Sequence, residues 1–204
     1  MRRLSLCLKL TPAILTCFVF APASPADPVH RFFKRDGYWH HGSGWIFPSQ
    51  VAGFALGRNP SEIDGNDDVT AEYASDAKGV HRDAVLDIYS PTSGAVGAKL
   101  DTAKADLQAR ASQGGACEVS VKEASFAIDR HPELKGVKIT FTPKKSAGCS
   151  QANLYFFHTD AWVISVRTSS VATDKDAAKA FDGFVRNQQW DTLGSDPLLH
   201  EPPT

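Results

Sequence analysis

The sequence has almost no excess of charge of either sign and little uninterrupted hydrophobic chain. Its 204 residues carry a formal net charge of −1, so no strongly basic surface points to nucleic acid or an anionic membrane as a partner. The longest apolar run, residues 10–20, contains Thr11, Pro12 and Thr16 and is too short for an ordinary transmembrane helix. We therefore expect no nucleic-acid binding and no stable insertion into a membrane.

Recognisable catalytic and cofactor motifs are missing as well. Neither metalloprotease spacing, His-Glu-x-x-His or His-x-x-Glu-His, occurs in the chain, and no glycine-rich loop fits a phosphate-binding fingerprint. The residues therefore predict no catalytic, cofactor-binding or metal-binding side chain, and no cofactor.

His40, His41 and Ser43 are nevertheless the strongest candidates for chemistry. A nucleophile elbow requires glycine two residues before its serine, where this chain has His41. Neighbouring strand residues point to opposite faces, so His40 and His41 are poorly arranged to chelate one metal ion. A loop could still bring them together with the other candidate imidazoles, those of His81, His131 and His158. A hydrolase or metal-dependent enzyme using His40, His41 and Ser43 is thus the alternative to a non-catalytic protein.

A second polar stretch partly matches a calcium-binding loop. Asp64, Asn66 and Asp68 occupy the first three ligand positions of such a loop. Val69 stands where the loop needs glycine, and Ser75 stands where it needs the bidentate glutamate. The expected structure here is a polar turn.

The N-terminus has the three parts of a secretory signal peptide. Arg2 and Arg3 form a basic start, residues 10–20 are the apolar core, and small residues follow at the cleavage positions. We expect residues 1–26 to be removed by cleavage after Ala26, with Ala23 as the alternative. The protein is therefore predicted to be periplasmic or secreted.

Cysteine is scarce, and export changes its meaning. Of four cysteines, Cys7 and Cys17 lie in the predicted signal peptide, which leaves Cys117 and Cys149. In an oxidising compartment two remaining cysteines favour a disulfide. We predict that Cys117 and Cys149 are bonded across one end of a sheet.

Hydrophobic periodicity predicts the secondary structure of the remaining chain. We expect strands at residues 69–75, 80–89, 117–128, 136–143, 151–158 and 161–170, and helices at residues 98–112 and 174–189. Neighbouring hairpins indicate an antiparallel sheet, and two amphipathic helices need a sheet face to cover. The predicted class is α+β, an antiparallel sheet flanked by helices in layers.

Two of these strands differ in regularity. Residues 80–89 alternate cleanly, with Ala84, Leu86 and Ile88 on one face and Asp83, Val85 and Asp87 on the other. In residues 117–128 the apolar phase slips, because Val119 and Val121 disagree in parity with Phe126 and Ile128. We expect a β-bulge near Glu123 to reconcile them, followed by a turn at residues 129–134.

The ends of the domain are set by composition. Residues 27–36 are expected to form a flexible lead-in, residues 37–190 a single α+β domain, and residues 191–204 a disordered tail with three prolines. Thr173 is the expected N-cap of the last helix.

Four lysines flank one predicted strand: Lys135, Lys138, Lys144 and Lys145. We interpret them as a solvated face that prevents association at an exposed sheet edge.

Residues 37–56 are the most aromatic part of the chain. Trp45 and Phe47 share parity on a short strand, so both rings are expected to enter one face of the core. His40 and His41 lie between glycines and tryptophans, where a loop would expose at least one imidazole. We therefore expect both histidines to be dispensable for stability.

Several of these segments resemble a group of uncharacterised exported bacterial proteins. The resemblance lies in Trp45-Ile-Phe-Pro, in Val51-Ala-Gly-Phe54 and in the closing Phe181-Asp-Gly-Phe184 helix with Trp190, and it covers roughly residues 40–190. The order of elements is similar to the fold of PsbP, the extrinsic photosystem II protein, which a Ran-binding transport factor also uses. The resemblance implies a PsbP-like sandwich of sheet and helices, and it carries over no catalytic residue.

Together these patterns predict an exported envelope protein that works as a non-catalytic binding or scaffolding module. Its expected partner is an envelope protein or a small ligand, and the sequence does not identify either.

Overall fold

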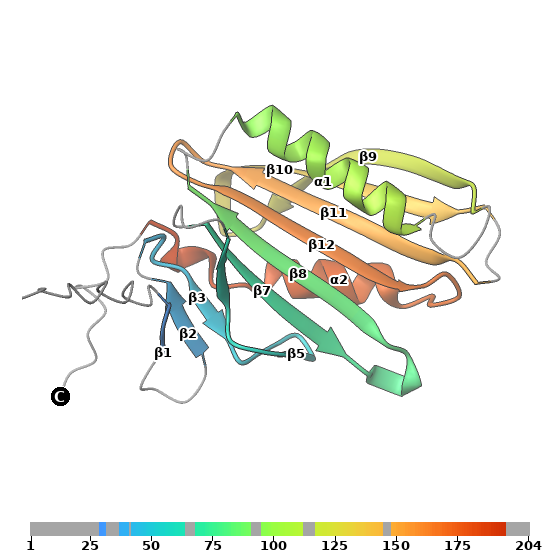
Figure 1. The fold of residues 1–204 in the computed structure, drawn as a ribbon, viewed down its shortest axis with the longest axis horizontal. Helices are drawn as coiled ribbons and strands as arrows, with labels where there is room; N and C mark the ends of the chain where they lie inside the picture. The colour runs from blue at the N-terminus through green and yellow to red at the C-terminus, as the bar shows by residue number, and fades with distance from the viewer. Residues whose placement is uncertain are drawn as a thin grey trace, which may run out of the picture.

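The computed structural model describes residues 29–31, 37–40, 42–63, 68–90, 95–111, 117–144 and 148–194. Within these residues, one antiparallel sheet of nine strands runs through the molecule. Helix α1 (Val96–Ala111) lies on one face of this sheet and helix α2 (Ala177–Arg186) on the other (Figure 1). The fold is α+β, as the sequence predicts.

The sheet joins an N-terminal and a C-terminal group of strands. Its order is β4-β5-β7-β8-β12-β11-β10-β9, and β6 also pairs with β7. The strands are β4 (Gln50–Val51), β5 (Phe54–Leu56), β6 (Ser61–Ile63), β7 (Asp68–Ser75), β8 (Arg82–Tyr89), β9 (Val119–Ile128), β10 (His131–Pro143), β11 (Ser150–His158) and β12 (Val163–Val171). The last strand, β12, therefore sits between β8 and β11.

A smaller sheet and two short helices complete the described chain. The three-stranded sheet consists of β1 (Val29–Arg31), β2 (Gly37–His40) and β3 (Ile46–Pro48). The 3-10 helices are η1 (Ala77–Gly79), between β7 and β8, and η3 (Trp190–Thr192), after α2. In this part of the chain, no helix combines the length and apolarity needed to cross a bilayer.

The face of the sheet toward α2 carries the main hydrophobic core. Trp45 and Phe47 have no exposed surface, and the Trp45 ring meets Trp190 edge-on at 5.1 Å between centroids. Phe181 and Phe184 of α2 pack against Phe54 from β5. The prediction that Trp45 and Phe47 enter one core is confirmed.

The opposite face carries a second, smaller core that α1 only partly covers. Leu107 of α1 packs with residues of β10 and β11, including Phe141, Leu154 and Phe156. Strands β7 and β8 lie beside α1 rather than beneath it (Figure 1). The clean alternation predicted for residues 80–89 is confirmed: Ala84, Leu86 and Ile88 are buried in the α2-side core.

The predicted bulge near Glu123 is wrong. Pairing of β9 with β10 is regular from Val119 to Phe126, and the register shifts instead between His131 and Gly136 of β10. The phase slip in β9 has another cause. Val119 packs on the α1-side core, whereas Phe126 and Ile128 belong to the α2-side core, so the two ends of the strand serve opposite faces.

The turn expected at residues 129–134 is shorter than predicted, because β10 already begins at His131.

Gly136 ends the irregular part of β10. A Cβ atom there would lie 2.3 Å from the Phe157 ring and 2.6 Å from the Phe126 carbonyl oxygen, so only glycine fits.

The beginning of the last helix also differs from the prediction. Helix α2 starts at Ala177 with Asp176 at the N-cap, three residues later than Thr173 would place it. At the domain ends, β1 lies within the expected lead-in, and Asp191 and Thr192 of the expected tail belong to η3. Residues 1–28 and 195–204 lie outside the described residues.

The lysine interpretation is wrong about the sheet edge and about Lys138, whereas Lys144 is solvated, with 59% of its side chain exposed. β10 is an inner strand, and the sheet edge on that side is β9. The Lys138 side chain is only 16% exposed, and its ammonium contacts the Asp182 carboxylate at 2.5 Å. Lys145 lies outside the described residues.

The predicted disulfide is confirmed. Cys117 and Cys149 are bonded, with their Cα atoms 6.1 Å apart. Cys117 precedes β9 and Cys149 precedes β11, so the bond clasps one end of the sheet on either side of β10.

Candidate functional site

The structure brings together two of the three residues singled out for chemistry. His40 ends β2 and Ser43 lies in the turn that follows, with 2.8 Å between imidazole Nδ1 and hydroxyl Oγ. Ser43 Oγ also accepts the Trp45 backbone N–H at 3.2 Å. His41 lies outside the described residues.

This pair supports a turn. His40 and Ser43 have no exposed surface, so a substrate cannot reach the serine hydroxyl unless the turn opens. The Ser43 carbonyl oxygen accepts the Gly194 N–H at 2.8 Å, which fastens the turn to the end of the described chain. The expectation that His40 is dispensable for stability rested on an exposed imidazole, and for His40 that premise is wrong because the side chain is completely buried.

His81 and His131 lie apart, each with its own partners, and His158 is exposed at the end of β11. His81 contacts Asp76 and Asp83, and both of its nitrogens are engaged. His131 lies between Glu133 and Asp191 with contacts of 3.0 Å. Among the residues that the structure describes, no group of three or more His, Cys, Asp or Glu side chains is placed to hold a metal ion.

The partial calcium pattern is also divided. Residues 64–67 lie outside the described residues. Asp68 is buried and accepts the Ser90 backbone N–H at 2.6 Å. Its carboxylate thus supports the end of β8.

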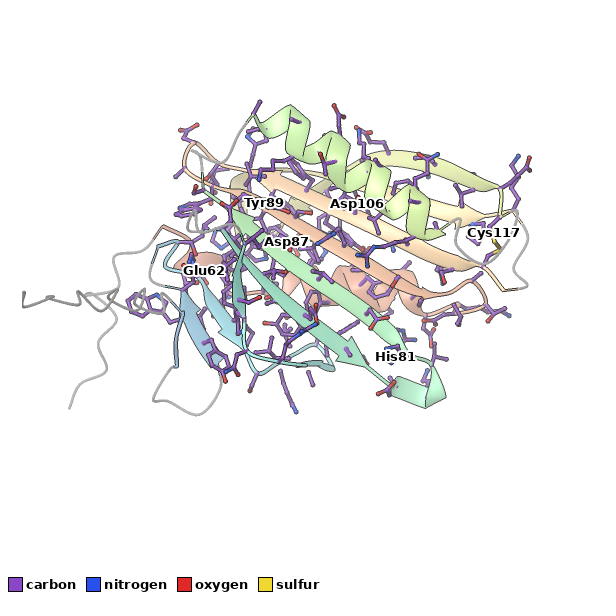
Figure 2. The ribbon with its side chains drawn as sticks, in the orientation of Figure 1. Glu62, His81, Asp87, Tyr89, Asp106 and Cys117 are labelled. Carbon is purple, nitrogen blue, oxygen red and sulfur yellow. A yellow bond between two sulfur atoms is a disulfide. The ribbon has the colours of Figure 1, made fainter. Side chains whose placement is uncertain are left out.

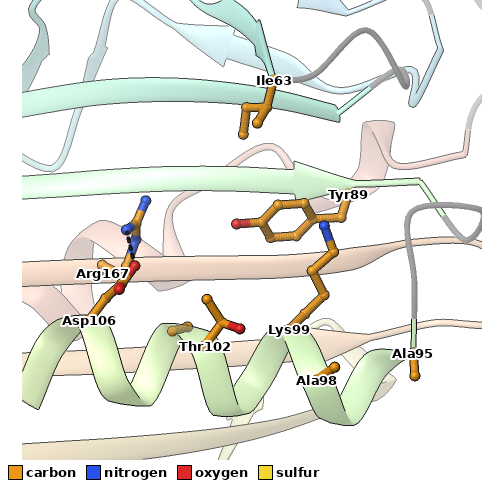
Figure 3. Close-up of a pocket in the computed structure, with 9 residues that line it drawn as sticks. Ile63, Tyr89, Ala95, Ala98, Lys99, Thr102, Asp106 and Arg167 are labelled. Carbon is orange, nitrogen blue, oxygen red and sulfur yellow. Dashed lines mark ion pairs between the residues drawn. The ribbon is translucent and has the colours of Figure 1, made fainter.

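A pocket of about 390 Å³ opens between α1 and the β8 side of the sheet (Figure 3). Ile63 of β6, Tyr89 of β8 and Arg167 of β12 line the sheet side. The helix side is formed by Ala95, Ala98, Lys99, Thr102, Ala103 and Asp106. Side chains from four separate elements therefore converge on one hollow.

The amino-acid sequence of α1 explains why this hollow exists. Residues 100, 103, 107 and 111 form the apolar stripe that packs on the sheet. Ala98, Thr102 and Asp106 form a neighbouring stripe of short side chains at helical spacing. Because these side chains do not fill the space beside β8, a cavity remains there.

Arg167, which lines the pocket, is paired with the buried carboxylate of Asp87, which does not itself line it. Asp87 has no exposed surface, and its carboxylate accepts from Arg167 Nη2 and Thr70 Oγ1, each at 2.7 Å. Burial raises the pKa of Asp87, and the Arg167 charge and the hydrogen bonds oppose that rise. Asp87 and Tyr89 lie on β8, opposite Asp106 on α1 (Figure 2).

Two further charges stand at the rim. Lys99 Nζ lies 4.2 Å from the centre of the Tyr89 ring and 3.5 Å from the Asp68 carboxylate. Arg167 Nη1 lies 3.7 Å from Asp106 Oδ2, a contact longer than a hydrogen bond (Figure 3). Burial also raises the pKa of the Tyr89 hydroxyl, so the phenol stays protonated at neutral pH.

A second hollow of about 230 Å³ meets the first at Arg167. It is lined by polar side chains of β7, β8 and the end of α1, including Glu72, Asp83 and Arg110. Two larger hollows lie near His131: one is lined mainly by polar side chains, and the other mainly by apolar ones, including Leu134 and Trp162. We regard the α1 pocket as the candidate site because one of its lining residues, Arg167, is held by the buried carboxylate of Asp87.

The sequence analysis missed this site. It placed Asp87 on the face of its strand opposite the apolar one, where carboxylates are normally solvated, so nothing marked Asp87 as buried. Arg167 carried no signal, because only the pairing of β12 with β8 brings it beside Asp87. In α1 the sequence analysis considered only the apolar stripe and not the neighbouring stripe of short side chains.

Comparison with known proteins adds no identity: no family model matches this chain, and no curated protein matches it. The geometry of the pocket and the sequence therefore carry the functional inference.

Proposed function

We propose that this protein is an exported, non-catalytic binding module of the cell envelope, and that the α1 pocket holds its ligand. The observation that carries the proposal is the pocket itself, a mostly apolar hollow with a few polar groups, of which Arg167 is held by the buried carboxylate of Asp87. Small-molecule sites commonly combine an apolar wall with a few positioned polar groups. Its size of about 390 Å³ lies in the usual range of such sites.

Export and architecture form part of the same proposal. The signal-peptide pattern of residues 1–26 motivates export, and the Cys117–Cys149 bond fits an oxidising compartment. Helices on both faces of one antiparallel sheet agree with a PsbP-like sandwich. Recovery of mature protein starting at Asp27 or Ser24 would support export, whereas intact Met1 on cytoplasmic protein would contradict it.

An enzyme built on His40 and Ser43 is the weaker proposal. Their 2.8 Å contact has the length that a nucleophile and a base need, but neither side chain has exposed surface. A binding role for the α1 pocket requires no such opening.

Filling the pocket tests the binding proposal. Ala98→Phe places a ring in the hollow, and Ala105→Phe places the same ring on an exposed position of α1 that does not line it. A mixture of envelope metabolites and fragments would be titrated into each mature protein and followed by NMR. We expect ligands to shift the amide signals of Tyr89, Lys99 and Asp106 in the wild type and in Ala105→Phe, but not in Ala98→Phe. Shifts that survive in Ala98→Phe, or no pocket shifts with any compound, would refute the proposal.

A further inference from the structure

The two ends of the α1 pocket differ in charge. At one end the Lys99 ammonium stands over Tyr89, and the positive end of the α1 dipole lies nearby. Asp68 offsets part of the Lys99 charge at 3.5 Å, and that carboxylate is already engaged by the Ser90 N–H. This end therefore favours an anionic group.

At the other end, Asp106 carries the charge that is left over. Arg167 contacts Asp87 at 2.7 Å and Asp106 at 3.7 Å, so one positive charge faces two negative charges and the three groups keep one net negative charge. The Asp106 side chain is 53% exposed, so a ligand can reach it. This end therefore favours a cationic group that also donates hydrogen bonds.

The separation of the two charges sets the length of a matching ligand. Lys99 and Asp106 are seven residues apart on one helix, which is two turns and places them on the same side. At a rise of 1.5 Å per residue, their backbones are about 10 Å apart. An extended peptide advances about 3.3–3.6 Å per residue, so roughly three residues span that distance. A single amino acid is too short to reach both ends.

The wall between the two charges limits the side chains of such a ligand. Ala98 and Thr102 face Ile63 across the hollow, and these residues offer short, mainly apolar contacts (Figure 3). Small apolar side chains fit this space better than bulky or charged ones.

We infer that the α1 pocket binds a short peptide of about three small residues with both termini free, its ammonium at Asp106 and its carboxylate at Lys99. The inference rests on the proposed binding function and specifies its ligand class. Recognition of free termini selects peptide fragments over the same sequence inside a longer chain, because a longer chain has no charged group at these two positions.

Trialanine is the direct probe, and its blocked forms are the controls. Trialanine, N-acetyl-trialanine and trialanine amide would be titrated into the mature protein and followed by NMR. Blocking either terminus removes one charge-assisted contact, which we expect to weaken binding about tenfold or more. Single alanine is expected to bind more weakly than trialanine.

Substitutions assign each terminus to its residue. Asp106→Asn should weaken trialanine about tenfold yet change N-acetyl-trialanine little, because the acetylated peptide has already lost that contact. Lys99→Met should likewise weaken trialanine about tenfold yet change trialanine amide little, because the amide has already lost the contact to Lys99. The matched controls are Asp101→Asn, an exposed position of α1 that does not line the pocket, and Lys179→Met on α2. Both controls should bind all probes like the wild type.

Two results overturn the inference, and they separate it from the binding proposal. If blocked and unblocked peptides shift the pocket signals with equal affinity, recognition of the termini is wrong, while binding in the pocket stands. If trialanine shifts no pocket signal in a protein that binds other fragments there, the peptide class is wrong. If no compound shifts pocket signals, the proposed function itself fails.

Discussion

His40 and Trp45 show how two neighbouring residues support one buried turn. His40 contacts Ser43, Ser43 accepts the Trp45 N–H, and the Trp45 ring packs edge-on against Trp190. The side chains of His40, Ser43 and Trp45 have no exposed surface. Any change here therefore acts on the fold before it acts on chemistry.

We expect Trp45→Ala to destabilise the protein by about 3–5 kcal/mol, because it empties a buried aromatic site. His40→Ala is expected to cost about 1–3 kcal/mol, since it leaves a buried Ser43 hydroxyl without this partner. Urea unfolding of the purified variants measures both. His158→Ala, an exposed position at the end of β11, is the control and should change stability by less than about 0.5 kcal/mol. A His40→Ala curve that overlays the control would contradict this account of the turn.

His81 is a second residue whose behaviour follows from its partners. The hydrogen bond that the ring donates to the Asp76 carboxylate and the charge of Asp83 raise its pKa above the ordinary 6.5. Its stabilising contact is therefore complete below the pKa of the unfolded chain, and it is lost as pH rises through the higher pKa of the folded state. We expect the His81 ring signals to titrate above pH 6.5 in NMR, and Asp76→Asn to lower the midpoint. A midpoint unchanged by Asp76→Asn would refute this, with Asp160→Asn as a matched exposed control.

The sequence predicts the aromatic residues of the turn but not its histidine. Trp45 and Phe47 are large, apolar and of one parity, so local pattern suffices for them. The turn that follows His40 is fastened from a distant part of the chain, because Gly194 N–H donates to the Ser43 carbonyl and Ile46 N–H donates to Thr192 Oγ1 at 3.2 Å. No local rule reports a contact between residues 146 positions apart.

Among the elements, β9 presents an edge with hydrogen-bonding capacity. The Lys144 N–H donates to the Glu118 carbonyl, so the backbone N–H and C=O groups of Glu118 and of every second residue after it point toward β10. The backbone groups of the residues between them point away from β10, toward the open edge; these residues are Val119, Val121, Glu123 and Ser125. Such an edge invites a second strand unless side chains oppose it.

Lys122 opposes self-association of this edge. An antiparallel pairing of two copies that uses all four outward residues places Lys122 opposite Lys122 of the second copy, and like charges in that position repel. We expect Lys122→Val to shift the protein toward dimers or larger species in sedimentation at low salt. Lys179→Val, at an exposed position of α2, is the matched control and should sediment like the wild type. Equal sedimentation of the two variants would show that Lys122 has no such role.

The elements also show why the candidate site escaped prediction. Alternation in β8 and helical spacing in α1 identify each element alone. The pocket depends on which strands become neighbours: β12 pairs with β8, so Arg167 reaches Asp87 from 80 residues away. Strand order depends on pairing between distant segments and is not encoded in the pattern of any single strand.

At the scale of the whole molecule, the Cys117–Cys149 bond closes a loop over 32 positions. Chain-entropy arguments make a loop of this length worth roughly 3.5–4 kcal/mol. We expect the double change Cys117→Ala, Cys149→Ala to lower the free energy of unfolding by about 2–4 kcal/mol in urea. The wild type under reducing conditions should match the double variant. Equal stability of the oxidised wild type and the double variant would mean that the bond contributes nothing.

The global class was predictable because it needs only element types. Hairpin patterns and two amphipathic helices suffice for an antiparallel α+β fold. The disulfide was predictable for a similar reason, because removal of the predicted signal peptide would leave two cysteines and one possible pair. The placement of β12 was not predictable, since hairpins define sequential neighbours and β12 has a non-sequential one in β8.

The position of β12 between β8 and β11 determines when, during synthesis, the sheet can form as a whole. A polypeptide emerges N-terminus first, so the β7–β8 hairpin and the β9–β11 meander are both made before β12 exists. Until residues 163–171 arrive, the two halves have no strand to join them, because β12 pairs with β8 on one side and β11 on the other. The sheet therefore closes only when most of the chain has emerged. The predicted signal peptide gives this late joining a consequence: a precursor exported unfolded would complete its sheet only near the end of translocation.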